Sequence, residues 1–153
     1  MLRAIKRALA AAQGETPAAP AQERHHLHLA VAVLLHEARR ADYDEGHEES
    51  APAEEALVDL FSLARPEAAA LLKEGRAKAQ ELTSFYAPVS TIKREFDLPD
   101  RIRLIEHLWR IAFADGRLNL YEDHYVRKIA HLLYVPNTQS MLARNRARAQ
   151  PGP

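Results

Sequence analysis

Two stretches of this 153-residue chain repeat one pattern, and the repeat constrains the fold more than any other feature. Residues 34–61 read LLHEARRADYDEGHEESAPAEEALVDLF, and residues 107–129 read HLWRIAFADGRLNLYEDHYVRKI. Each stretch is an apolar helical segment, an Ala-Asp turn, an acidic pair and a second apolar helical segment. A helical hairpin cannot bury its apolar stripe alone, whereas two packed copies can. The repeat therefore predicts a compact all-α bundle built from two related helical hairpins.

Helical spacing of apolar residues continues outside the repeat, and no alternating β-branched pattern appears anywhere. Prolines and polar residues at the ends of these segments are typical helix start and stop signals. The sequence predicts helices from Glu23 to Ala41, from Ala51 to Ala64, from Pro66 to Leu82, around Val89–Phe96, from Pro99 to Phe113, through Tyr125–Leu133 and after Asn137. The segment from Pro99 is apolar on most of its circumference, so we expect it at the centre of the bundle, with Trp109 in the core.

The N-terminal part of the chain differs from the rest. Residues 1–13 predict a short amphipathic helix, with apolar Leu2, Ile5 and Leu9 on one side and basic Arg3, Lys6 and Arg7 on the other. Residues 14–22 contain two prolines among alanines, a composition typical of a flexible linker. The sequence thus divides into a basic arm and linker, residues 1–22, and a helical domain, residues 23–153.

Composition excludes several classes of protein. The chain has no cysteine, which rules out zinc–thiolate sites, iron–sulfur clusters, thiol catalysis and disulfide scaffolds. No apolar run approaches the roughly 18 residues of a membrane span. The 21 basic and 21 acidic residues balance, which argues against a nucleic-acid partner. We therefore expect a cytoplasmic protein, or a membrane-peripheral one if residues 1–13 make weak contact with a membrane surface.

The second repeat also supports a family resemblance. The stretch LWRIAFADGRLNLYEDHYVRKIAHLL resembles the TerB family of tellurite-resistance-associated helical proteins, whose hairpins contain an A-D-G-x-(L/I)-x-x-x-E turn. Residues 29–63 resemble a more divergent first copy, with Tyr43 where glycine is expected and a loop five residues longer. The likeness extends over residues 25–148. It implies a compact helical domain with an acidic surface, for which metal binding has been proposed and no catalytic mechanism is established.

The resemblance implies a set of candidate metal ligands, residue by residue. They are Asp115 and Glu122 in the second turn and Asp42 and Glu54 in the first. Clustered carboxylates suit Ca²⁺ or Mg²⁺, and Zn²⁺ is a further candidate. Helix capping explains the second turn without a metal, because Asn119 and Glu122 have capping-box spacing and Gly116 suits a helix stop. Neither turn has the spacing of an EF-hand.

Three functions remain open at this stage. The first is a non-enzymatic, stress- or tellurite-resistance-associated module that binds a divalent cation or a protein partner through its acidic turns. The second is a metal-dependent hydrolase with Asp42, Asp115 and Glu122 as ligands, although the chain has no nucleophile elbow, Walker loop or zinc-protease motif. The third is a membrane-peripheral adaptor that uses residues 1–13 as its anchor.

Overall fold

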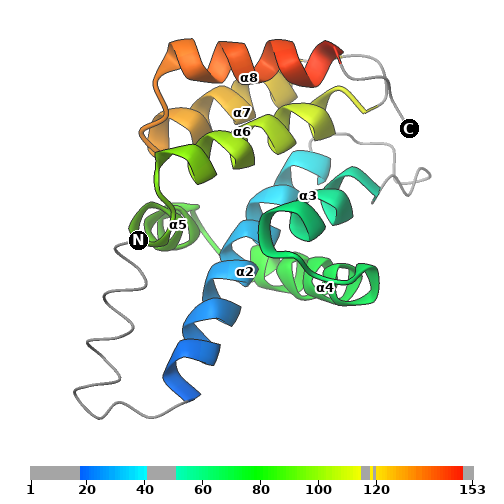
Figure 1. The fold of residues 1–153 in the computed structure, drawn as a ribbon, viewed down its shortest axis with the longest axis vertical. Helices are drawn as coiled ribbons and strands as arrows, with labels where there is room; N and C mark the ends of the chain where they lie inside the picture. The colour runs from blue at the N-terminus through cyan, green and yellow to red at the C-terminus, as the bar shows by residue number, and fades with distance from the viewer. Residues whose placement is uncertain (1–17, 41–50, 115–117, 119, 150–153) are drawn as a thin grey trace.

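The computed structural model describes residues 18–40, 51–114, 118 and 120–149. Seven helices account for most of these residues, and the described part of the chain contains no strand (Figure 1). The helices are α2 (Ala18–Arg40), α3 (Ala51–Phe61), α4 (Arg65–Glu81), α5 (Tyr86–Glu95), α6 (Leu98–Ala112), α7 (Leu120–Leu132) and α8 (Asn137–Ala149). The all-α prediction is confirmed. The helix expected over residues 1–13 lies outside the described residues.

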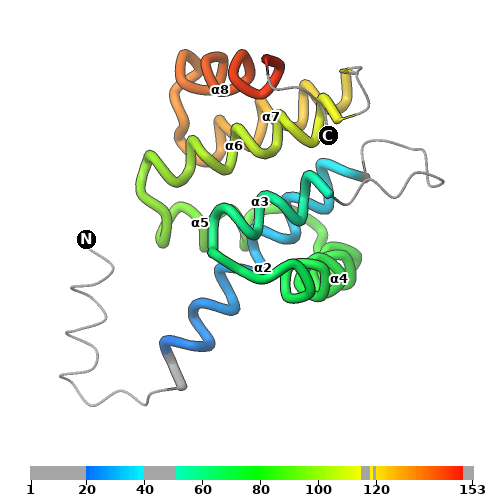
Figure 2. The backbone as a smooth tube through the Cα atoms, turned by 45° about the vertical axis from the view of Figure 1, so that its right-hand side comes forward, coloured from blue at the N-terminus to red at the C-terminus, as the bar shows by residue number. Residues whose placement is uncertain are grey.

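Two helices share the centre of the bundle. Helix α2 packs against α3, α4, α5, α6 and α7, while α6 packs against α8, α3, α7 and α2. Figures 1 and 2 show α6, α7 and α8 side by side at one end of the molecule, with α3, α4 and α5 around α2. The core contains Trp109, as expected, and it extends along the buried face of α2 as fully as along α6. The sequence predicted a central position for α6 only, whereas the structure places α2 at the centre as well.

Local chemistry explains where the helices begin. Asp97 precedes α6, and its side chain accepts a hydrogen bond from the backbone N–H of Asp100 at 3.0 Å, with Pro99 in the first turn. Helix α4 likewise has Pro66 in its first turn. The ends of α3 and α7 are followed by Ser62 and Tyr134, both with φ of 56°, the left-handed conformation that stops a helix.

One boundary differs from the prediction. Helix α2 begins at Ala18, so residues 18–22 of the predicted linker are helical. Pro20 is compatible with this helix, because a proline within the first turn removes only an N–H that would have no intrahelical partner. The alanines around it are the best helix formers. The division of the chain at residue 22 into arm and domain stays a prediction.

The repeat corresponds to two pairs of helices in the structure. Helices α2 and α3 contact each other, and so do α6 and α7. The segments that join the two members of each pair, residues 41–50 and most of 113–119, lie largely outside the described residues. The hairpin relationship therefore remains the prediction made from the sequence pattern.

Candidate functional site

The four candidate ligands divide into two described and two undescribed residues. Asp42 and Asp115 lie outside the described residues. Glu54 lies in the first turn of α3, and its Oε1 is 3.9 Å from Arg65 Nη1 at the start of α4. Glu122 lies in the first turn of α7. A carboxylate in a first turn is stabilised by the partial positive charge of the helix N-terminus, which accounts for this placement of both residues.

Glu122 differs from the other acids in its burial. Its residue is only 3% exposed, and it is the one acidic residue in the described part of the chain that is buried. Placing a carboxylate out of water is costly unless hydrogen bonds or a cation compensate for the lost hydration. The stability of ionised Glu122 therefore depends on the groups around it. Glu54, in contrast, is partly exposed beside Arg65.

A hydrogen bond fixes the start of α7 against α2. The hydroxyl of Tyr125 donates to the backbone oxygen of Leu34 at 2.8 Å. Burial raises the pKa of Tyr125 well above its ordinary value of 10.0, and the nearby Glu37 adds to this effect, so the phenol stays protonated. Residues three apart share one face of a helix, so Glu122 lies on the same side of α7 as Tyr125.

The helix ends that flank the two acidic turns lie at the same end of the molecule. Figures 1 and 2 both show the C-terminal ends of α2 and α6 there, together with the N-terminal ends of α3 and α7. The contact between Tyr125 and Leu34 supports this arrangement, since it joins the first part of α7 to the last part of α2. We call this end, which includes Glu54 and Glu122 among its described carboxylates, the acidic corner. Among the described residues, no group of three His, Asp or Glu side chains could hold a metal ion.

A second cluster of polar residues was not anticipated from the sequence. His107 Nε2 lies 2.7 Å from Asp59 Oδ2, and Arg103 Nη2 lies 3.0 Å from the same oxygen. Burial lowers the pKa of His107, and the hydrogen bond from His107 lowers the pKa of Asp59. The cluster joins α6 to α3 and explains how an imidazole is accommodated on the buried face of α6. The sequence feature that could have indicated this cluster is His107, a histidine on an apolar face of its helix.

Acidification is expected to lower the free energy of unfolding through His107. Its folded pKa lies below the ordinary 6.5, so the unfolded chain binds more protons as the pH falls from 6.5 toward the folded value, and stability is lost there. Asp59 acts in the same direction at lower pH, because its stabilisation is present above 3.8 and is lost as the pH falls through its depressed pKa. Urea unfolding at about pH 7.5 and about pH 5.5 measures the difference.

The matched variants for this experiment are His107→Gln and His26→Gln. We expect a smaller difference between the two pH values in the first variant and no change in the second, because His26 is exposed. His28, whose pKa is also lowered by burial, supplies a residual difference of the same sign. Identical pH dependence in wild type and His107→Gln would contradict the assignment.

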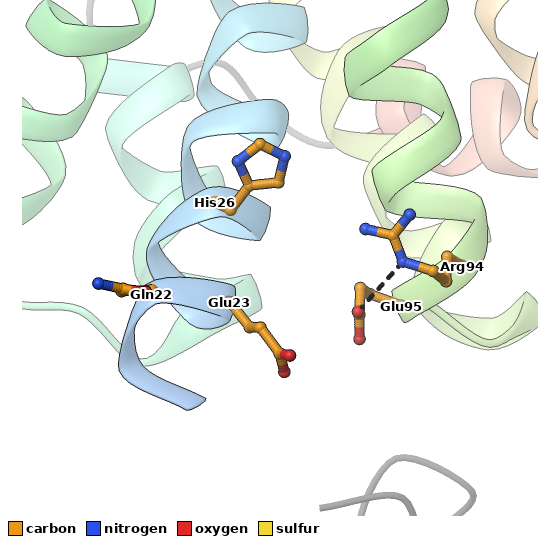
Figure 3. Close-up of a pocket in the computed structure, with 5 residues that line it drawn as sticks. All are labelled: Gln22, Glu23, His26, Arg94 and Glu95. Carbon is orange, nitrogen blue, oxygen red and sulfur yellow. Dashed lines mark ion pairs between the residues drawn. The ribbon is translucent and has the colours of Figure 1, made fainter. Parts of the chain in front are cut away.

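A separate hollow lies between α2 and α5 (Figure 3). Its volume is about 540 Å³, and it is lined by Gln22, Glu23 and His26 of α2 and by Arg94 and Glu95 of α5. Glu23 and Arg39 are 16 positions apart on α2, which corresponds to roughly 24 Å at the helical rise. The hollow is therefore remote from the acidic corner and shares none of the predicted ligands.

Comparison with known proteins gives one result. The family model described as tellurite resistance protein TerB matches residues 28–145, which is most of the chain. No curated protein and no solved structure gives a significant match. Among the described helices, none combines the length and the apolar composition needed to cross a membrane.

Proposed function

The chain belongs to the TerB family, and from that premise we propose that it is a non-enzymatic, stress-associated module that binds a divalent cation at the acidic corner. The loaded corner would be the surface offered to a protein partner. The observation that supports this proposal is the burial of Glu122, one turn before Tyr125, whose hydroxyl donates to the backbone oxygen of Leu34 in α2.

The donor set favours a hard cation. Ca²⁺ and Mg²⁺ need several oxygen ligands at once. Glu122 is a carboxylate in the first turn of α7, which starts at the end of the molecule where α2 and α6 end and α3 begins. Asp42 and Asp115 stand one in each of the segments that connect these helices, and Glu54, which now lies beside Arg65, would be a further ligand. Arg65 also lies 3.6 Å from Glu55, so it keeps an acidic neighbour after that change. Zn²⁺ is less suited to an all-carboxylate set.

A calorimetric titration with Ca²⁺, Mg²⁺ and Zn²⁺ tests the proposal. We expect wild type to bind Ca²⁺ or Mg²⁺, and Asp115→Ala and Asp42→Ala each to weaken binding at least about tenfold, equivalent to about 1.4 kcal/mol. Glu81→Ala is the matched control, because it removes an exposed carboxylate from the end of α4. Circular dichroism of each variant verifies that it is folded.

Two results would overturn the cation proposal. The first is the absence of binding heat for all three metals in wild type, which would leave helix capping as the role of these residues. The second is equal affinity in wild type, Asp42→Ala and Asp115→Ala, which would place the ion elsewhere. A hydrolase would also need a substrate pocket beside the ion, and the hollow between α2 and α5 does not provide one there.

A further inference from the structure

Helix α8 contains three arginines and no acidic residue. Figures 1 and 2 show it along one edge of the molecule, where it packs on α6 and α7. Its buried side consists of Ser140, Ala143 and Ala147. Leu142 is 46% exposed, and Arg146, four residues further on, shares its face of the helix. The outer side of α8 is therefore cationic and has an exposed aliphatic side chain one turn from an arginine.

Arginines outnumber carboxylates where α8 meets α6. Two of them share Glu106 of α6, whose Oε2 lies 3.0 Å from Arg110 Nη2 and whose Oε1 accepts a hydrogen bond from Arg146 Nε. Arg144 and Arg148 form no ion pair with any residue that the structure describes. We call these four arginines, together with Glu106, the arginine edge. Its positive charge exceeds its negative charge, which favours an anionic partner.

An aromatic ring, rather than an acid, holds Arg144 in place. Its Cζ lies 5.6 Å from the centre of the Trp109 ring, which is fully buried. The Nε atoms of Arg144 and Arg110 are both buried and have no hydrogen-bond partner in the described part of the chain. A buried N–H without an acceptor lowers stability, and the attraction between cation and ring offsets only part of that cost. Stability alone therefore does not account for an arginine at either position.

We propose that the arginine edge binds an acidic segment of a protein partner, whose carboxylates pair with the guanidinium groups of Arg144 and Arg146. Guanidinium groups hold carboxylates in a planar, bidentate geometry. Arginine is enriched at protein interfaces and lysine is depleted there, and α8 contains no lysine. Arg144 is already ordered on Trp109, so binding costs it little conformational entropy. Leu142 supplies an apolar contact, which a phosphate backbone would not use. This inference is independent of the cation proposal, because it concerns other residues.

Fluorescence anisotropy with a labelled synthetic peptide tests the proposal. The probe is a helix-forming peptide of glutamate, alanine and leucine, and its counterpart has glutamine in place of every glutamate. We expect the full-length protein to bind the acidic peptide at least about tenfold more tightly than the glutamine peptide, since hydrogen bonds between two charged groups are the stronger ones. The affinity for the acidic peptide is expected to fall as salt is added.

The variant Arg144→Met separates a binding role from a structural one. Methionine keeps an unbranched side chain over Trp109 and removes both the charge and the buried Nε–H. We expect this variant to bind the acidic peptide about tenfold more weakly, with an unchanged or higher midpoint of thermal unfolding. Arg146→Gln is expected to weaken binding as well. The matched control is Arg76→Gln, which removes an exposed arginine from α4, at the other end of the molecule (Figure 1).

Three outcomes would overturn the proposal. A lower unfolding midpoint of Arg144→Met with unchanged affinity would mean that Arg144 only stabilises the contact with Trp109. Equal affinity of wild type, Arg144→Met and Arg146→Gln for the acidic peptide, or no binding by wild type, would remove the arginine edge as its site. Tighter binding of single-stranded RNA or of phosphatidylglycerol vesicles than of the acidic peptide, lost in the same two variants, would assign the edge to phosphate groups instead.

Discussion

Replacing Trp109 with alanine is expected to lower the free energy of unfolding by about 4 kcal/mol, within the range of about 3–5 kcal/mol for large aromatic truncations. The side chain is 0% exposed, and it lies where α6 packs on α8. Its ring is stacked on Phe113 with 6.3 Å between centroids, and Arg144 Cζ lies 5.6 Å from the ring centre. Its Nε1 donates to Ser140 Oγ at 3.4 Å. Truncation therefore leaves a cavity and a buried hydroxyl without this donor.

Thermal unfolding followed by circular dichroism measures this loss. For a chain of this size, each kcal/mol corresponds to about 2–4 °C, so the midpoint should fall by roughly 8–16 °C. The matched control is Tyr121→Ala, since Tyr121 is also aromatic but is 73% exposed. We expect that control to change stability by no more than about 0.5 kcal/mol. Equal losses in the two variants would contradict the placement of Trp109 at the centre of the α6–α8 contact.

The core and the helix starts were predictable because their signals are local. Pro66 and Pro99 fall in the first turns of α4 and α6, as predicted, since proline fixes a helical φ where no N–H is needed. The burial of Trp109 followed from the apolar residues around it at helical spacing. Pro20 is the exception, because the same chemistry permits proline both in a linker and in a first turn.

The polar contacts of the interior were not predictable, because they join residues far apart in the sequence. His107 and Asp59 are separated by 48 positions, and nothing in either segment indicates that α6 crosses α3 at that point. The hydrogen bond from Tyr125 to Leu34 spans 91 positions. It depends on how α7 approaches α2, which the periodicity of neither helix specifies.

In the candidate site, too, the local features were predictable and the long-range contacts were not. The sequence placed Glu54 and Glu122 at helix starts, and both lie in first turns. It did not predict that Glu122 would be buried and Glu54 paired with Arg65, because burial depends on which neighbours cover the turn. Asp42 and Asp115 lie outside the described residues, so their role as ligands stays a prediction.

Gly75 is the residue whose importance only the structure reveals, and Gly75→Ala is expected to destabilise the protein by about 1–3 kcal/mol. In the exposed interior of a helix the same change stabilises by about 1 kcal/mol, so the sign of the effect is diagnostic. A Cβ added at Gly75 would lie 2.8 Å from Ala32 Cβ and 2.9 Å from the Ala32 carbonyl carbon. The glycine therefore permits the close approach of α4 to α2.

The clash cannot be relieved by rotating a side chain, because two of its atoms belong to the backbone of α2. The double variant Gly75→Ala/Ala32→Gly is consequently expected to recover only part of the loss, since the Ala32 carbonyl oxygen would remain 3.1 Å from the new Cβ. Ala77→Gly, on the exposed side of α4, is the matched control. It measures the effect of helix propensity alone, with an expected cost of about 1 kcal/mol. Urea unfolding of the four proteins gives the comparison. A Gly75→Ala variant more stable than wild type would mean that α2 and α4 are not held this close, and the position of α2 at the centre of the bundle would then need revision.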